Sequence, residues 1–381
     1  MLPHDQRYNS VPPGDWKTQL RTRFMVNASL YDTSSATAGK PRVDWIDAAK
    51  GLTIMLVVMK HVTYGTAVSL GSTPYFFNIL SEWTIPFRMP LFFLVAGLFA
   101  QKALRAPARQ FFDSKVLHFA YFYLLWSVIQ IGLKIVLPHE GNWLVTYNDL
   151  LMIPLEPFGL LWFIYSLAAY FTIMRFARDV RPAIMIFFAL AFYFTRLDTG
   201  WTMPDEFARR FIFFVSGVYA APYVFTLASW TMTHVTRGLL TGTAALAAVG
   251  GVIYTGAIDF RTVELATGFI GAAGTIMLVA ILAKKGYAKP LTFIGARSLY
   301  IFLAFFLPMA ATRVGMIKLG FENGDFITLV TFIMAIGMPV LAYEVTKDTI
   351  LDFAFKRPSF FRLKPVPAAI SPETVSTIPS M

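Results

Sequence analysis

The chain contains no cysteine and few charged residues among its 381 positions. Without cysteine, a disulfide framework, a thiolate nucleophile and a thiolate metal site are all excluded. The sequence also lacks a glycine-rich phosphate loop and histidines paired at metal-ligand spacing, so no metal site is predicted. Charged residues make up 14% of the chain and hydrophobic residues 56%. This composition is too apolar for a soluble domain and indicates a chain that has lipid as its solvent.

Apolar runs near the length that spans a bilayer, about 17–25 residues, recur along the chain. They begin near Leu52, Pro86, Val116, Leu160, Pro182, Phe211, Leu239, Leu265, Phe293 and Phe326. The sequence therefore predicts an all-α, polytopic membrane protein with about ten transmembrane helices.

The net charge of +11 does not predict a nucleic-acid partner, because the basic residues follow a topological pattern. With the N-terminus inside, the inner segments hold 22 of the 33 Lys and Arg residues, the outer segments 7, and the spans 4. Arg313 is among those assigned to an outer segment. The positive-inside rule then predicts that both termini are cytoplasmic and favours an even number of spans.

The chain divides into three predicted parts. Residues 1–41 are polar and broken by Pro12, Pro13 and Gly14, so we expect a disordered cytoplasmic arm without a signal peptide. Residues 42–350 form one membrane domain with short loops, and residues 351–381 form a polar cytoplasmic tail to which the sequence assigns no function. The two halves of the membrane domain show no convincing repeat, which weakens a transporter built from inverted repeats.

The first span carries the best candidates for chemistry, because ionisable residues inside a membrane span are costly unless they pair or line a wet cavity. Asp47, Lys50 and His61 follow helical spacing. The eleven steps from Lys50 to His61 bring the two within about 20° of one face, about 16 Å apart along the axis. Lys50 is therefore expected at the cytosolic edge and His61 at or beyond the midplane.

A neutral imidazole can remove a proton from a hydroxyl near neutral pH, so His61 suits the role of a general base. From spacing alone, the alternative is a histidine that forms a hydrogen bond between helices. Lys60 is expected to snorkel or to pair rather than to take part in catalysis.

The pattern Trp45-Ile-Asp47, Lys50-Gly51, Val57-Val58 and His61 resembles the first-span signature of acyltransferase family three. Further blocks agree in order along residues 42–344: Arg88-Met-Pro-Leu-Phe-Phe-Leu-Val-Ala-Gly97, Leu160-Leu-Trp162-Phe163, Phe213-Phe-Val-Ser-Gly217 and Gly295-Ala-Arg-Ser298-Leu-Tyr300-Ile. The sequence departs from the family in having Lys115-Val-Leu-His118 where Arg-x-x-Arg is common, which loses two guanidinium forks. It also has Ala96 and Ala304 where serine and histidine are common.

This resemblance implies a multi-pass enzyme of the bacterial inner membrane that transfers an acetyl or succinyl group. The donor would be cytosolic acyl-CoA as co-substrate, with no permanently bound cofactor, and the acceptor a hydroxyl of an extracytoplasmic polysaccharide, lipopolysaccharide or periplasmic glucan. It implies that His61 is catalytic and that Lys50 supports it. Asp47, Lys50 and His61 together form a stripe along one face of the first span. The alternative is a transporter or flippase for a glycan or lipid-linked intermediate; a purely structural membrane partner is disfavoured by the stripe.

Five residues are candidates for substrate binding: Arg88, Trp162, Arg297, Lys115 and His118. Arg88 opens the second span at a depth similar to His61. Its guanidinium could hold a sugar or an acyl carboxylate, or stabilise an oxyanion. The alternative is a structural ion pair with Glu82. For Arg297 a structural pair with Glu344 is favoured. Lys115 belongs to basic loops that suit the phosphates of coenzyme A, although a role in topology is favoured.

Overall fold

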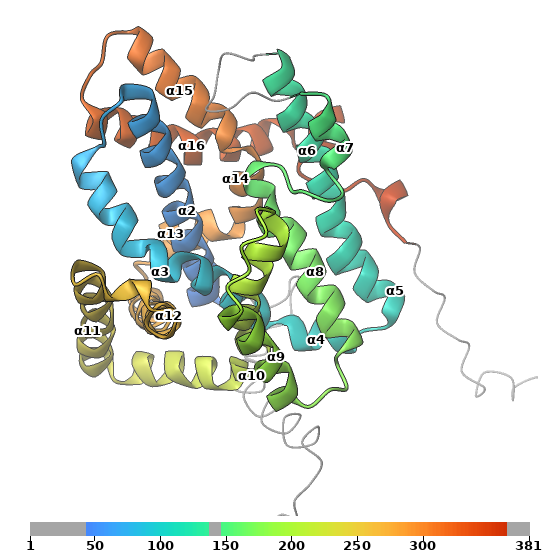
Figure 1. Ribbon diagram of the computed structural model, residues 1–381, viewed down its shortest axis with the longest axis vertical. Coiled ribbons are helices and arrows are strands. Elements are labelled where there is room, and N and C mark those ends of the chain that lie inside the picture. Colours follow the sequence, from blue (N-terminus) through green and yellow to red (C-terminus); the bar gives the residue numbers. More distant parts are fainter. Residues whose placement is uncertain (1–42, 137–145, 364–381) are drawn as a thin grey trace, which may run out of the picture.

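The computed structural model describes residues 43–136 and 146–363, and every regular element within them is helical. The predicted N-terminal arm lies outside the described residues. The main helices are α2 (Asp44–Leu70), α3 (Tyr75–Leu98), α4 (Ala100–Arg105), α5 (Ala108–Phe111), α6 (His118–Val136), α7 (Asn148–Met152), α8 (Trp162–Phe176), α9 (Pro182–Phe194), α10 (Thr202–Thr233), α11 (Val235–Tyr254), α12 (Arg261–Lys284), α13 (Lys289–Ala296), α14 (Ser298–Ala304), α15 (Phe306–Lys318) and α16 (Gly324–Thr346) (Figure 1).

Short segments complete these helices. A π-helical segment, Phe112–Leu117, joins α5 to α6, and 3₁₀ turns occur at Gly159–Leu161, Ala257–Asp259, Ile350–Ala354 and Ser359–Phe361.

The prediction of an all-α polytopic membrane protein is confirmed. Eight helical segments in the described part of the chain are long and apolar enough to span a bilayer, and the pair α14–α15 makes a ninth if it is one bent span. The span predicted to begin near Pro182 corresponds to α9, which has only 13 residues. At 1.5 Å per residue α9 is about 20 Å long, shorter than the hydrocarbon core.

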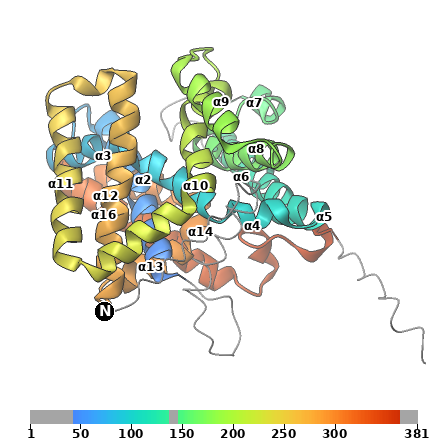
Figure 2. The same ribbon diagram turned by 90° about the horizontal axis from the view of Figure 1, so that it is seen from below.

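Successive spans run up and down between two faces of the bundle. The face that carries residue 43, the turn at residues 106–107 and residues 350–363 is called the proximal face here. The opposite face, with residues 71–74 and 255–260, is called the distal face (Figure 2). Residue 43 and residues 350–363 thus lie on the same face of the bundle (Figure 2).

Helix α2 forms the centre of the bundle and packs against α3, α12, α13 and α16 (Figure 1). Its crossing with α13 is unusually close because glycines face each other. A Cβ atom on Gly51 would overlap the carbonyl oxygen of Leu291, and one on Gly295 would overlap the carbonyl oxygen of Asp47. Backbone therefore touches backbone beside Asp47, as small residues allow at helix interfaces in membranes.

The span predicted near Phe293 is not one continuous helix. It comprises α13, α14 and α15, and α14 meets α15 at Phe305 with a bend of 54°. Pro308 explains this break, because it has no N–H to donate to the carbonyl of Ala304 and its ring clashes with the preceding turn. The break lies against the middle of α2.

Candidate active site

The candidate catalytic residues lie along one side of α2. Asp47 and Lys50 form an ion pair of 3.1 Å, and the Lys50 side chain is 34% exposed at the proximal face. Because α2 is unbroken from residue 44 to residue 70, it keeps the helical spacing that places His61 about 16 Å deeper on nearly the same side. The three residues thus connect the proximal face to the interior.

His61 is enclosed by the bundle but keeps accessible surface. Its ring is packed deep among protein atoms, although the side chain is partly exposed. The ring lies 6.0 Å from that of Phe305, at the break between α14 and α15. No hydrogen bond joins His61 to another residue in the described part of the chain. This geometry disfavours a histidine whose role is to bond two helices, and it leaves the imidazole available to a substrate.

Arg88 of α3 brings positive charge to the same place. The charges of Arg88 and Lys60 both act on His61. The Arg88 Nη1 atom is buried and forms no hydrogen bond with any described residue. Lys60 differs, because its Nζ atom lies 3.2 Å from a carboxylate oxygen of Glu82. Lys60 therefore pairs as expected, and Glu82 is not the partner of Arg88 that the alternative required.

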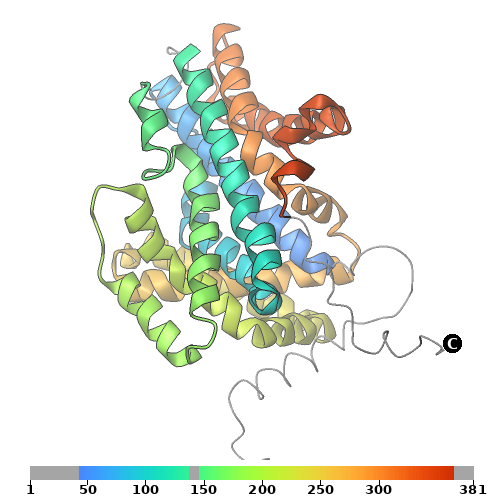
Figure 3. The same cartoon turned by 90° about the vertical axis from the view of Figure 1, so that its right-hand side faces the viewer.

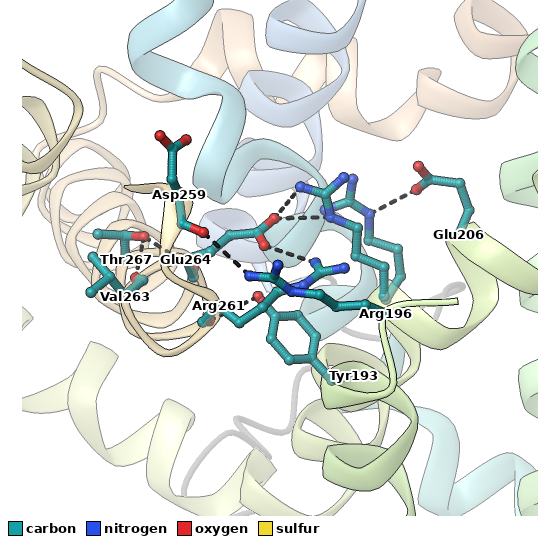
Figure 4. Close-up of polar contacts among 10 residues, drawn as sticks. Tyr193, Arg196, Glu206, Asp259, Arg261, Val263, Glu264 and Thr267 are labelled. Carbon is teal, nitrogen blue, oxygen red and sulfur yellow. Dashed lines mark hydrogen bonds and ion pairs between the residues drawn. The ribbon is translucent and has the colours of Figure 1, made fainter. Parts of the chain in front are cut away.

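A network of charged residues joins the distal ends of α10 and α12 (Figure 4). Glu264 of α12 bridges two arginines, one of which is Arg209 of α10. Arg210 forms a pair of 2.9 Å with Glu206 one turn away, and the charges of both act on Arg88. The network fixes the start of α10 against α12 and places the charges of Arg210 and Glu206 near Arg88.

Arg313, which the sequence analysis assigned to an outer segment, is part of a helix and of the bundle interior. Arg313 lies in α15 and is only 4% exposed. Its guanidinium packs against Gly65, one helical turn beyond His61, where a Cβ would overlap it. The sequence held two signals: Pro308, which permits a bent helix to continue past the break, and a glycine four residues after His61. A buried arginine at membrane depth is a functional candidate that sequence reasoning missed.

The remaining candidates are distributed over three places. Arg297 forms the expected pair with Glu344 at 3.0 Å, and the close crossing of α13 places it on the proximal side near Asp47. Trp162 begins α8, with its ring 6.0 Å from that of Phe93 of α3. It forms part of an aromatic wall and makes no ring contact with His61 among the described residues.

Lys115 and His118 form a separate proximal group at the start of α6. The Lys115 Nζ atom lies 4.9 Å above the Phe171 ring, and the His118 ring lies 5.0 Å from that of Phe122. Helix α6 is not among the helices that pack extensively on α2, so this group is distinct from the stripe of Asp47, Lys50 and His61. No cluster of three or more His, Cys, Asp or Glu residues that could hold a metal ion occurs in residues 43–136 and 146–363.

Comparison with known proteins agrees with this arrangement. Residues 43–343 match the sequence model of the family described as an acyltransferase domain, which is acyltransferase family three. The chain belongs to this family. It is therefore a multi-pass membrane acyltransferase, and the resemblance found in the first span is confirmed. The match covers the helices from α2 to α16 and ends before residues 350–363. No curated protein and no solved structure matches the chain.

Proposed function

We propose that this acyltransferase moves an acetyl or succinyl group from acyl-CoA to a hydroxyl of an extracytoplasmic glycan in the bacterial inner membrane. The observation that carries the proposal is the placement of His61. It lies inside the bundle, without a hydrogen-bond partner among the described residues, between Lys50 near the proximal face and Arg313 on its distal side. We infer that the two substrates approach this imidazole from opposite faces of the bundle.

The proposed chemistry uses His61 as a general base. The imidazole takes the proton of a sugar hydroxyl while the hydroxyl oxygen attacks the thioester carbonyl. The tetrahedral intermediate places negative charge on the former carbonyl oxygen, and Arg88 supplies donors for it. The carbon–sulfur bond then breaks, the acyl group stays on the sugar as an ester, and the thiolate of coenzyme A receives the proton from the imidazolium.

The proposed orientation follows from charge. The proximal face carries the basic segments around Lys102–Lys115 and Arg175–Arg181, and basic loops remain in the cytosol. The same field attracts polyanionic coenzyme A. We therefore assign the proximal face to the cytosol, where the donor loads, and the distal face to the glycan acceptor. Lys50 and its partner Asp47 stand at the donor entrance, and the aromatic wall around Trp162 suits contact with the apolar faces of a sugar.

A transporter or flippase is less well supported. Transporters of the inverted-repeat kind have broken helices in both halves, around a site at the repeat interface. Within the described residues only α14 and α15 form a bent pair, and both lie in the second half. This single break is explained by Pro308 and brings Phe305 to His61, which serves an active site equally well.

The proposal is tested by the mass of envelope polysaccharides from a deletion strain complemented with wild-type protein or with His61→Ala. We expect one acyl increment to be missing in the deletion strain and in the His61→Ala strain, and to return with the wild type. Unchanged polysaccharides in the deletion strain would contradict the proposed acceptor class. Loss of the whole polysaccharide, rather than of the acyl group alone, would favour a transporter.

A further inference from the structure

Residues 350–363, termed the C-terminal strap here, lie beside the start of α6, outside the part of the chain that matches the family (Figure 3). Tyr121 donates a hydrogen bond of 3.0 Å to the carbonyl of Phe353, and Trp126 donates one of 2.8 Å to the carbonyl of Ala354. Phe355 is 5% exposed and lies against Trp126. The strap is thus held on the proximal side of α6, next to Lys115 and His118.

Arg357 is the charged residue that the strap buries. Its side chain is 5% exposed, and one terminal nitrogen lies 2.7 Å from Asp113 Oδ2. Asp113 also accepts a hydrogen bond of 2.8 Å from the backbone N–H of Leu363. The Nε and Nη1 atoms of Arg357 are buried and form no hydrogen bond with any described residue. Buried guanidinium donors without acceptors are costly, so this geometry suits a site that gains its acceptors from a ligand.

The surroundings of Arg357 are strongly basic. Arg357, Lys115 and Arg362 are the cations that act on the His118 ring, opposed there by Asp113 alone. Arg362 also donates a hydrogen bond of 3.2 Å to the backbone carbonyl of Arg357. Three permanent cations beside one carboxylate leave an excess of positive charge, which favours a ligand with more than one negative charge.

The chemistry of the guanidinium narrows the ligand to a phosphate. A guanidinium offers a planar fork that matches two phosphate oxygens, whereas a lysine acts as a point charge. At positions 115 and 118 this chain has lysine and histidine, neither of which offers a guanidinium fork. The C-terminal strap brings an arginine to the same place from about 240 residues away in the sequence.

We infer that Arg357, with Lys115 and His118, binds a phosphate group of the acyl-CoA donor, and that this phosphate takes up the Nε and Nη1 donors that Asp113 leaves unused. The inference rests on the proposed function, in which acyl-CoA is the donor. Because these nitrogen atoms have no exposed surface, the strap has to lift locally to admit the ligand. This opening breaks the ion pair between Arg357 and Asp113. The phosphate of an anionic lipid has the same chemistry, so the experiment includes lipid with and without an anionic headgroup.

The test uses the full-length protein in nanodiscs and measures the affinity for coenzyme A and for dephospho-coenzyme A, in neutral lipid and in lipid that contains phosphatidylglycerol. We expect Arg357→Ala to weaken coenzyme A binding about tenfold or more, as for loss of a charged hydrogen bond. If Arg357 binds the 3′-phosphate, Arg357→Ala should also change the ratio of the affinities for coenzyme A and dephospho-coenzyme A. Arg357→Lys, which keeps the charge and is the second variant if Arg357→Ala does not fold, should recover only part of the affinity.

Lys356→Ala is the matched control, because it removes the same charge from the adjacent residue. Lys356 pairs with Asp352 at 3.1 Å and is 58% exposed, and this partner raises the pKa of Lys356. Its loss should leave coenzyme A affinity within about twofold. Wild-type affinity in both Arg357 variants would overturn the inference, as would an effect of Arg357 that appears only with phosphatidylglycerol. Absence of coenzyme A binding by the wild type would instead refute the donor of the proposed function.

Discussion

The two halves of α2 differ in how their polar groups are used. In the proximal half, Asp47 and Lys50 satisfy each other, and Gly51 lets the backbone of α13 approach closely. In the distal half, His61 has no hydrogen-bond partner among the described residues, and Arg88 beside it has a buried donor without an acceptor there. Groups that complete one another hold a structure, whereas groups left incomplete inside a membrane await a ligand. We therefore assign support to the proximal half and chemistry to the distal half.

The largest effect is expected at His61. His61→Ala should lower acyl transfer by about 10²–10⁴-fold because it removes the proton-transfer step, while expression and membrane insertion stay near normal. His61→Gln is the sharper control, because it retains hydrogen-bonding capacity without basicity. Turnover by His61→Gln at the wild-type rate would show that His61 has a structural role. The assignment of chemistry to the distal half of α2 would then fail.

Arg88→Gln should rank second. Loss of one preorganised donor to an oxyanion costs about 10²–10³-fold in kcat, and the change should appear in kcat more than in the KM for acyl-CoA. Arg209→Gln is the comparison, since Arg209 pairs with Glu264 in the distal network and should affect thermal stability more than turnover. An equal loss of kcat in both variants would mean that Arg88 acts only by supporting the fold.

Gly295→Ala tests the packing of the proximal half. The added methyl group would overlap the carbonyl oxygen of Asp47, and such overpacking costs about 1–3 kcal/mol. We expect a lower midpoint of thermal unfolding in detergent. Gly337→Ala in α16, where a Cβ meets nothing within 4 Å, should leave the midpoint unchanged or raise it. A Gly295→Ala variant as stable as the wild type would show that the crossing is looser than described.

The smallest effect separates Lys50 from Lys60. Lys50→Ala should lower kcat/KM about tenfold, as for one charged hydrogen bond, because Lys50 shares the side of His61 and stands at the proposed donor entrance. Lys60→Ala removes a partly exposed pair with Glu82 and should cost less than about threefold. Equal tolerance of both substitutions would break the stripe argument.

Much of this arrangement could be predicted from the sequence because it depends on local pattern. The lengths of the apolar runs located the transmembrane segments, and helical spacing placed Lys50 and His61 on one side of α2. Arg297 could be matched with Glu344 because both lie near the same end of their spans. The bent helix was missed, because apolar composition does not separate a straight span from one interrupted at Pro308. The burial of Arg313 in α15 was missed for the same reason.

The C-terminal strap shows a different limit. Arg357 meets Asp113 across 244 residues of sequence, and no spacing rule connects two positions so far apart. Only the folded chain brings an arginine from the tail to the place where the Lys115–His118 motif lacks one. A polar segment after the last span can therefore pack on the proximal side of α6 although it looks like a simple tail in the sequence.

The central claim is that donor and acceptor reach His61 from opposite faces, and sidedness tests it most directly. In proteoliposomes of defined orientation, acyl-CoA supplied only on the face that bears the N-terminus should acylate acceptor enclosed with the opposite face, and free coenzyme A should appear on the donor side. His61→Ala proteoliposomes are the control and should give neither product. Turnover that requires both substrates on the same face would contradict the account, even if His61 proved essential.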